Sequence, residues 1–171
     1  WLIINGLNVP PAWVIGCEKQ KDRPLININA IIAALIDDAE DPDTALFSVR
    51  SGAPVSMPGQ LKTKLNVPLH EIQDRANEVW DSWDSSNAKE YRDKNGISHD
   101  LGTAVIIQKM VPNIKYSGVA FTNDPTNYFA KTEYKPIVEY VRGTGEALVS
   151  GSKTPRKCTG RERFFKNLNY C

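Results

Sequence analysis

Two stripes of apolar residues recur at the spacing of an α-helix. The first occupies positions i, i+3, i+4, i+7, i+8 and i+11: Ile28, Ile31, Ile32, Leu35, Ile36 and Ala39. Asn27 precedes this stripe and can cap the helix that it predicts. The second stripe is Leu69, Ile72, Ala76, Val79, Trp80 and Trp83. We expect both stripes to face a hydrophobic core, and a shorter helix at residues 88–94 to end at Gly96.

Short runs of apolar and β-branched residues predict strands at residues 13–15, 46–50, 103–110, 115–122, 137–141 and 147–150. The run at 103–110 is continuously apolar, which predicts a strand buried on both faces. Residues 1–5 resemble the end of a helix, and one more strand precedes Leu69, so the predicted order is α-β-α-β-β-α-α-β-β-β-β. Strands gather late in the chain without regular βαβ alternation, which favours an α+β fold over a doubly wound sheet.

Length and charge narrow the class of protein. The chain has 171 residues, enough for one domain with a real core, and its formal net charge is +1. This near-neutral charge argues against non-specific nucleic-acid binding, although residues 156–171 form a basic tail. No apolar run approaches the roughly 20 residues of a membrane helix. The three widely spaced cysteines, Cys17, Cys158 and Cys171, indicate reduced thiols in a cytoplasmic protein and not a disulfide framework.

A loop rich in small residues follows the strand expected at 46–50. It runs from Ser51 through Gly52 and Pro54 to Gly59, directly after Arg50. The backbone N–H groups of such a loop, together with one guanidinium, can surround phosphate oxygens. A strand, a glycine turn and a solvated arginine are also a common structural pattern without any ligand. The residues alone leave both interpretations open.

Five stretches of the chain carry a more specific pattern. In chain order they are LNVPPAWVI (7–15), FSVRSGAPVSMPGQLKTKLNV (47–67), WDSWDSSNAKEYRDKNGISHDLGTAVIIQKMV (80–111), SGVAFTNDP (117–125) and EYVRGTGEALVSGSKTP (139–155). Together they resemble the nucleotide-binding domain of the pyruvate phosphate dikinase and phosphoenolpyruvate synthase family, over about residues 5–155. The resemblance implies a single ATP-grasp-like domain over residues 1–171, in which two small α+β parts hold ATP between mixed or antiparallel sheets flanked by helices.

The resemblance also implies which residues contact the nucleotide. Arg50 stands at the position of a phosphate-binding arginine, and Gly59 and Thr63 lie in the loop that covers the nucleotide. A solvent-facing helix residue is the alternative for Thr63. Gln108 and Met110 match a Q-x-M-V segment that borders the adenine, where Met110 would form a soft apolar wall. Without the resemblance, Met110 would be interpreted as plain core.

Glu139 stands where the family has a strand glutamate that binds magnesium. A magnesium ion on nucleotide phosphates needs only one or two protein carboxylates. Lys153, in the segment GSKTP, stands where the dikinase branch has a catalytic arginine. It keeps the positive charge without the bidentate geometry that stabilises a transferring phosphoryl group. Thr144 also departs from the family pattern, and these two changes affect turnover more than ATP binding.

The leading hypothesis is an ATP-binding domain that uses Mg²⁺-ATP for phosphoryl transfer to a histidine or another acceptor in trans. The partner would be a histidine-bearing domain or a full-length relative. The alternative is a non-catalytic family remnant that binds or regulates a protein partner, which Lys153 and the short span between Val67 and Trp80 favour. The family's phosphate-binding lysine would precede residue 1. His70 and His99 lack the context of the family's phosphorylated histidine, so we expect no enolpyruvate product from this chain alone.

Overall fold

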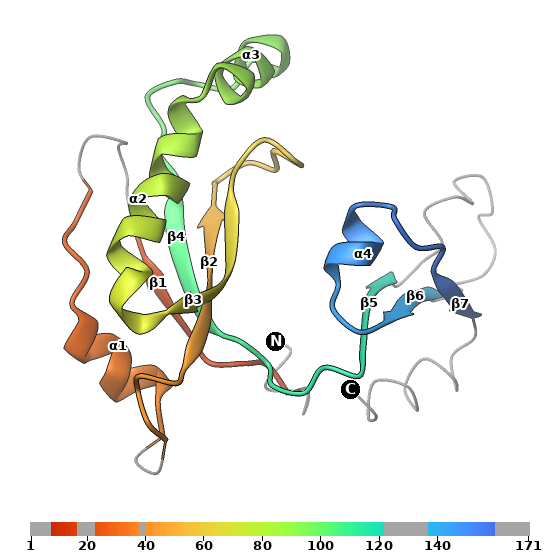
Figure 1. Cartoon of the computed structure of the whole chain (residues 1–171). Helices are drawn as coiled ribbons and strands as arrows, with labels where there is room; N and C mark the ends of the chain where they lie inside the picture. Colours follow the sequence, from red (N-terminus) through yellow and green to blue (C-terminus); the bar gives the residue numbers. More distant parts are fainter. Residues whose placement is uncertain (1–7, 17–22, 38–39, 122–136, 160–171) are drawn as a thin grey trace. The chain divides into compact units, whose positions relative to one another are not determined.

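The structure is a computed structural model that describes residues 8–16, 23–37, 40–121 and 137–159. The chain forms two compact units, Trp1–Met110 and Val111–Cys171 (Figure 1). Each unit carries its own antiparallel sheet, so the α+β class predicted from the sequence is confirmed. The helix end expected at residues 1–5 and both Cys17 and Cys171 lie outside the described residues.

The first unit is built on a four-stranded antiparallel sheet with the order β1-β4-β2-β3. Its strands are β1 (Ala12–Ile15), β2 (Leu46–Gly52), β3 (Thr63–Pro68) and β4 (Ala104–Lys109). Ile107 of β4 lies opposite Trp13 of β1 on one side and Val49 of β2 on the other. The strands expected at 13–15, 46–50 and 103–110 are therefore present, with small shifts at their ends.

The first helix, α1 (Ile28–Leu35), begins where its apolar stripe predicts. The side-chain oxygen of Asn27 accepts a hydrogen bond from the Ala30 N–H at 3.2 Å, so Asn27 is the expected cap. The helix ends earlier than the stripe suggests, because the backbone of Ile36 is already extended.

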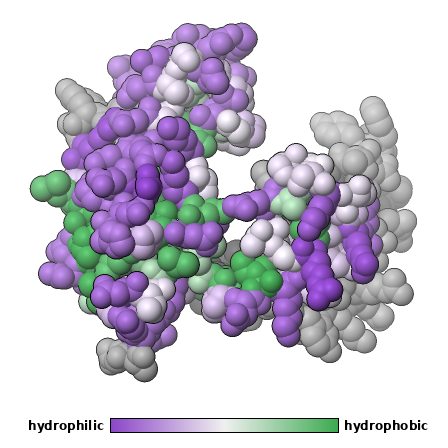
Figure 2. Space-filling model, viewed as in Figure 1, coloured by the Kyte–Doolittle hydropathy of each residue, from purple (hydrophilic) through white to green (hydrophobic). Residues whose placement is uncertain are grey.

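The second apolar stripe is also helical. It runs through the 3-10 turn η1 (Leu69–Glu71), α2 (Ile72–Asp81) and the 3-10 turn η2 (Ser82–Asp84). The shorter helix that follows, α3 (Ser86–Asn95), ends at Gly96, whose φ of 63° is left-handed and suits a glycine cap. In Figure 2 the outward surfaces of α2 and α3 are mostly hydrophilic, as expected for amphipathic helices.

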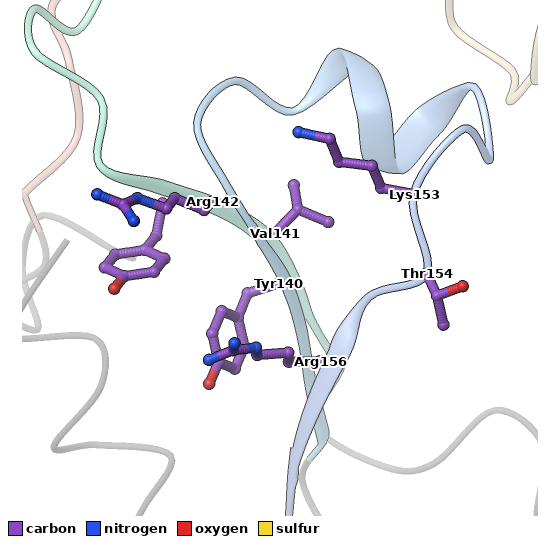
Figure 3. A pocket seen from close by; sticks show the side chains of 7 residues that line it. Tyr140, Val141, Arg142, Lys153, Thr154 and Arg156 are labelled. Carbon is purple, nitrogen blue, oxygen red and sulfur yellow. The ribbon is translucent and has the colours of Figure 1, made fainter.

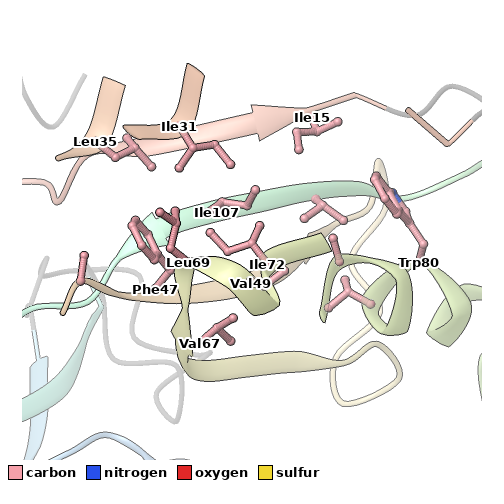
Figure 4. Close-up of a cluster of buried hydrophobic side chains, with 14 residues drawn as sticks. Ile15, Ile31, Leu35, Phe47, Val49, Val67, Leu69, Ile72, Trp80 and Ile107 are labelled. Atoms are coloured by element: carbon pink, nitrogen blue, oxygen red, sulfur yellow. The ribbon is translucent and has the colours of Figure 1, made fainter. Parts of the chain in front are cut away.

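The core of the first unit lies on one face of its sheet (Figure 4). α1 and α2 cover this face, and the buried residues from helices and strands include Ile15, Ile31, Leu35, Phe47, Val49, Val67, Ile72, Val79, Trp80, Val105 and Ile107. Along β4, buried Val105 and Ile107 alternate with half-buried Ile106. The expectation that this strand is buried on both faces is therefore wrong. An antiparallel sheet can pack its helices on one side, and the described residues place no helix on the other.

A buried arginine joins α3 to the turn before it. Arg92 is 1% exposed, its guanidinium carbon lies 4.3 Å from the centre of the Trp83 ring, and its Nη1 donates to the Trp83 carbonyl at 2.6 Å. Its Nη2 lies 3.2 Å from Nδ1 of His99, which must accept because a guanidinium only donates. Nε2 of His99 then carries the proton that faces Asp93 Oδ1 at 2.7 Å. Burial lowers the pKa of Arg92, while the carboxylates of Asp84 and Asp93 oppose that shift.

The second unit is a three-stranded antiparallel sheet with the order β5-β6-β7. Its strands are β5 (Tyr116–Phe121), β6 (Ile137–Arg142) and β7 (Arg156–Thr159). The first two match strands expected from the sequence. The sequence pattern does not indicate β7, because its residues belong to a stretch whose most visible feature is positive charge.

Residues 147–150, which the sequence pattern predicts as a strand, belong mainly to helix α4 (Glu146–Val149), so that expectation is wrong. The segment follows a turn in which Gly143 has a φ of 91°. The Ser150 N–H donates to the Glu146 carbonyl at 2.9 Å, which is the spacing of one helical turn. Local hydrogen bonds of this kind pair backbone groups that a strand would have to pair with a neighbour.

Gly118 allows β5 and β6 to pair closely. It lies opposite Tyr140. A Cβ atom at position 118 would stand 2.5 Å from the carbonyl oxygen of Glu139 and 3.2 Å from the Cα atom of Tyr140. Both are backbone atoms that cannot rotate away, so this pairing requires a glycine.

Replacing Arg92 with alanine should lower the free energy of unfolding by about 2–4 kcal/mol, because the Trp83 carbonyl loses its donor and a cavity opens beside the indole. Urea unfolding followed by tryptophan fluorescence measures the change. Lys94→Ala is the matched control, since Lys94 lies on the same helix in an exposed ion pair with Glu90, and it should change stability very little. Equal effects of the two substitutions would contradict the role assigned to Arg92.

Replacing Gly118 with alanine should destabilise the second unit by about 1–3 kcal/mol, the usual range for forcing an extra carbon into a packed site. Hydrogen exchange should become faster at the amides of β6. Gly145→Ala is the control, because a Cβ there would meet only the Ser117 Cβ at 3.5 Å and the φ of −71° suits alanine. Unchanged exchange in Gly118→Ala would show that the strands adjust without cost.

Candidate functional site

The face of the first sheet opposite its core forms the first part of the candidate site. Side chains alternate along a strand, so β2 turns Phe47 and Val49 to the core and Ser48 and Arg50 to the other face. We call this the open face, and its residues are Val14, Ser48, Arg50, Thr63, Ile106 and Gln108. It combines apolar and hydrogen-bonding side chains around one cation.

Arg50 is the cation of the open face. Its Nε donates to Ser48 Oγ at 3.1 Å, and the Ser48 hydroxyl donates to the Gln108 carbonyl at 3.4 Å. These contacts hold the inner end of the guanidinium against the sheet. Arg50 is exposed, and its two terminal nitrogens have no partner among the described residues, so they can receive an anion.

Gly59 lies in the connection between β2 and β3, and Thr63 follows directly after this connection. Thr63 is the first residue of β3 and lies directly opposite Arg50, so the alternative that Thr63 belongs to a helix is wrong. Gly59 has a φ of 73°, and a Cβ at this position would meet nothing within 4 Å. Glycine is therefore needed for the direction of the backbone and not for space within the structure.

Gln108 and Met110 lie at the end of β4. The Gln108 side-chain amide donates to the Pro10 carbonyl at 3.0 Å, which ties it to the chain before β1. Met110 is half-buried, and its N–H donates to the Leu46 carbonyl at 2.9 Å. That N–H is thus used by the protein itself, which leaves the carbonyl group and the side chain of Met110 as groups that could contact adenine.

Glu139 lies in the middle of β6, opposite Val119 of β5 and Lys157 of β7. Its Oε1 is 2.8 Å from Lys157 Nζ, and its side chain is 28% exposed. Val119 and Phe121 lie on the same face of the sheet and are partly exposed. Glu139 is therefore a half-buried carboxylate in apolar surroundings that already has a cationic partner.

Lys153 lies in the loop between α4 and β7. It lines a hollow of about 200 Å³ (Figure 3), whose other lining residues are Tyr116, Tyr140, Val141, Arg142, Thr154 and Arg156. Glu139 is not among them, and it points to the opposite side of β6 from Tyr140. Within the described part of the second unit, the two predicted residues Glu139 and Lys153 are thus not brought into one hollow.

Several residues of these surfaces are absent from the sequence-based prediction, and the polar ones include Ser48, Tyr140, Arg142 and Arg156. Ser48 could have been found, because it lies two residues from Arg50 in one strand and must share its face. The same rule relates Tyr140 to Arg142. Arg156 could not be placed from the sequence, because nothing there indicates β7.

A metal ion would find few protein ligands in this part of the chain. Among the described residues there is no group of three or more His, Cys, Asp or Glu side chains that could hold one. Magnesium at Glu139 would therefore need nucleotide phosphates and water for the rest of its coordination shell. None of the described helices is long and apolar enough to cross a membrane.

Comparison with known proteins finds relatives in one family. The model of the pyruvate phosphate dikinase AMP/ATP-binding domain matches residues 24–165. A probable phosphoenolpyruvate synthase of Archaeoglobus fulgidus is 39% identical over 124 residues, which are 68% of this chain and 16% of the relative. The phosphoenolpyruvate synthase of Aeropyrum pernix is 37% identical over 124 residues, which are 68% and 14% of the two chains. The chloroplastic pyruvate, phosphate dikinase of Flaveria trinervia is 39% identical over 93 residues, which are 52% of this chain and 9% of the relative.

The family match includes every predicted site residue, from Arg50 to Lys153, whereas Val14 of the open face precedes the matched segment. The segments matched make up only a small part of each relative, at most 16% of those named. The family predicted from the sequence motifs is nevertheless confirmed, because its model covers most of the chain. The chain belongs to the family of the pyruvate phosphate dikinase AMP/ATP-binding domain, whose fold is ATP-grasp-like.

Proposed function

We propose that this chain binds Mg²⁺-ATP and serves phosphoryl transfer to a histidine or another acceptor in trans. The observation that carries the proposal is the open face, where Arg50, Thr63 and Gln108 lie together within the matched family segment. A nucleotide needs an apolar surface for its base and convergent polar groups for its phosphates. The open face offers both.

Arg50 and Thr63 are the proposed phosphate contacts. Directly opposite residues of an antiparallel pair have Cβ atoms about 4.5–5.5 Å apart, so one phosphate group can reach both side chains. Ser48 holds the Nε end of Arg50, which reduces the freedom that the guanidinium must lose on binding. Gly59 would let the loop backbone approach the phosphates, and the Met110 side chain would contact adenine.

Glu139 is the proposed magnesium ligand. One carboxylate is enough for a metal that takes its other ligands from phosphate and water, so the donor set fits in number. The ion would neutralise phosphate charge during transfer. Glu139 would first have to exchange its ion pair with Lys157 for the metal. Lys153 is proposed to place a point charge near the transferring group, without the bidentate geometry of arginine.

The acceptor is proposed to lie on another polypeptide segment or protein, such as a histidine-bearing domain or a full-length relative. The relatives named phosphoenolpyruvate synthase and pyruvate, phosphate dikinase are much longer than the part that this chain matches. His70 and His99 do not serve as the acceptor in this proposal, and His99 is already held between Arg92 and Asp93. The dispersed cysteines fit a reducing, cytoplasmic location.

A second candidate function is a non-catalytic module that keeps the fold and binds a protein partner. The ion pair between Glu139 and Lys157 favours it, because a cation already occupies the proposed metal ligand. Isothermal titration calorimetry with ATP, with and without Mg²⁺, separates the two candidates. The first requires metal-dependent binding and the second predicts none.

Replacing Arg50 with alanine should weaken Mg²⁺-ATP binding by about 1.5–3 kcal/mol, the range for a hydrogen bond to a charged group. Calorimetry measures the loss. Lys89→Ala removes the same charge from an exposed position on α3 and should leave the affinity nearly unchanged. If the folded Arg50→Ala protein binds as tightly as the parent, Arg50 does not belong to the site.

Replacing Glu139 with glutamine keeps the shape of the side chain and removes its charge. The Mg²⁺ dependence of ATP binding should then largely disappear, because the metal loses its protein ligand. Titrations of parent and variant with and without the metal provide the comparison. Glu146→Gln, on exposed α4 of the same unit, is the control and should keep the parent's dependence. A Glu139→Gln protein that keeps it too would assign the metal to another carboxylate.

A further inference from the structure

The second sheet has a face whose chemistry the proposed function does not use. Tyr140 and Arg142 of β6 point to the side opposite Glu139, because side chains alternate along the strand. Their cross-strand neighbours share that side, since Arg142 lies opposite Tyr116 and Tyr140 lies opposite Arg156. We call these four residues the Tyr–Arg face.

The four side chains form a compact set. The rings of Tyr116 and Tyr140 lie edge to face, with their centres 6.0 Å apart. Each arginine lies directly across from one tyrosine, so the two guanidinium groups flank the tyrosine pair. Lys153, in the loop between α4 and β7, lines the same hollow (Figure 3). Three cationic residues and two tyrosines are thus among the residues that line a space of about 200 Å³.

No described acidic residue balances the positive charge of this hollow. No acidic side chain is among its seven lining residues. Arg142, Lys153 and Arg156 are exposed, and none forms an ion pair with another described residue. In a chain with a formal net charge of +1, such a concentration of positive charge creates a local potential that attracts anions.

We propose that the Tyr–Arg face, together with Lys153, is an anion site for the phosphate group of a small phosphorylated ligand. Guanidinium forks bind phosphate oxygens in pairs, and phenol hydroxyls donate further hydrogen bonds. The hollow is smaller than the roughly 300 Å³ at which pockets for drug-sized ligands begin, so it suits one phosphate group with a small substituent. Single-stranded nucleic acid would need a longer basic groove with bases stacked on ring faces, whereas Tyr116 and Tyr140 pack edge to face.

This inference goes beyond the proposed function and does not depend on it. Glu139 and Lys157 lie on the other side of the sheet, so a ligand on the Tyr–Arg face leaves the proposed metal ligand free. Lys153 is the one residue that both proposals use. For this reason the experiment measures phosphate binding in a titration that contains no ATP.

The test is a titration of the whole chain with inorganic phosphate, followed by the backbone amide signals of residues 140–142 and 153–156 in NMR spectra. We expect saturable shifts of these signals with half-saturation at about 1 mM phosphate. Such weak binding is typical of a few exposed hydrogen bonds to a charged group. Arg142→Ala and Arg156→Ala should each weaken binding about tenfold. Lys89→Ala, which removes one exposed charge from α3 in the other unit, should have no effect.

Three further arms decide between the remaining outcomes. If phenyl phosphate binds more tightly than inorganic phosphate, the ligand is an organic phosphate. If inorganic phosphate binds more tightly, the ligand is the free ion. Both results support the proposed anion site. Saturating Mg²⁺-ATP that displaces phosphate competitively would overturn it, because the hollow would then belong to the ATP site. An oligodeoxythymidylate that binds the same residues more tightly than either probe would also overturn it, in favour of a nucleic-acid surface.

The substitutions themselves carry little risk to the fold. Arg142 and Arg156 are exposed, and thermal unfolding should show unchanged midpoints for both variants. Linear shifts without saturation, or equal weakening by Arg156→Ala and Lys89→Ala, would reduce the binding to a general effect of charge and overturn the proposal. If this chain binds no ATP at all, the phosphate titration still tests the anion site.

Discussion

The register between β2 and β4 is the constraint on which the first unit depends. It pairs Val49 with Ile107 and Arg50 with Ile106, and it continues to Gly52 and Ala104. Since side chains alternate along both strands, the same register that buries Val49 and Ile107 also turns Arg50 outward. A slip by one residue would bring the guanidinium into the hydrophobic core, where a charge without a partner is costly. The stability of the core and the geometry of the open face are therefore set by one pairing.

The second unit uses the same alternation with a different result. Its β6 separates Glu139, which is paired with Lys157, from Tyr140 and Arg142 on the opposite side. One side thus offers a carboxylate among partly exposed apolar residues such as Val119, and the other offers positive charge that no acidic residue in the described segments balances. Gly118 holds this arrangement together, because any side chain at its position would collide with the backbone of β6.

The chemistry of the proposed site depends on which cation Glu139 prefers. The Lys157 ammonium is 2.8 Å away and belongs to the same sheet. Its pairing with the carboxylate therefore costs no translational or rotational entropy of association. A doubly charged metal brings a stronger interaction but must also bind nucleotide phosphates to complete its shell. Metal and nucleotide should therefore bind together at Glu139 rather than one by one. This coupling distinguishes a working nucleotide site from a sheet stabilised by an ordinary ion pair.

The sequence by itself determined the described helices of the first unit, most strands, the family and the residue types of the site. The helical stripes that begin at Ile28 and Leu69 are readable because amphipathic helices repeat locally, and the motif around Arg50 is readable because its small residues and prolines are distinctive. The tertiary structure decided which face of the first sheet is covered by helices, and this corrected the burial expected for β4. It also showed a helix where a strand was expected at 147–150. It also paired Glu139 with Lys157 and brought Arg156 next to Tyr140. These relations depend on strand pairing between distant segments, and side-chain patterns along one segment carry no information about its partner.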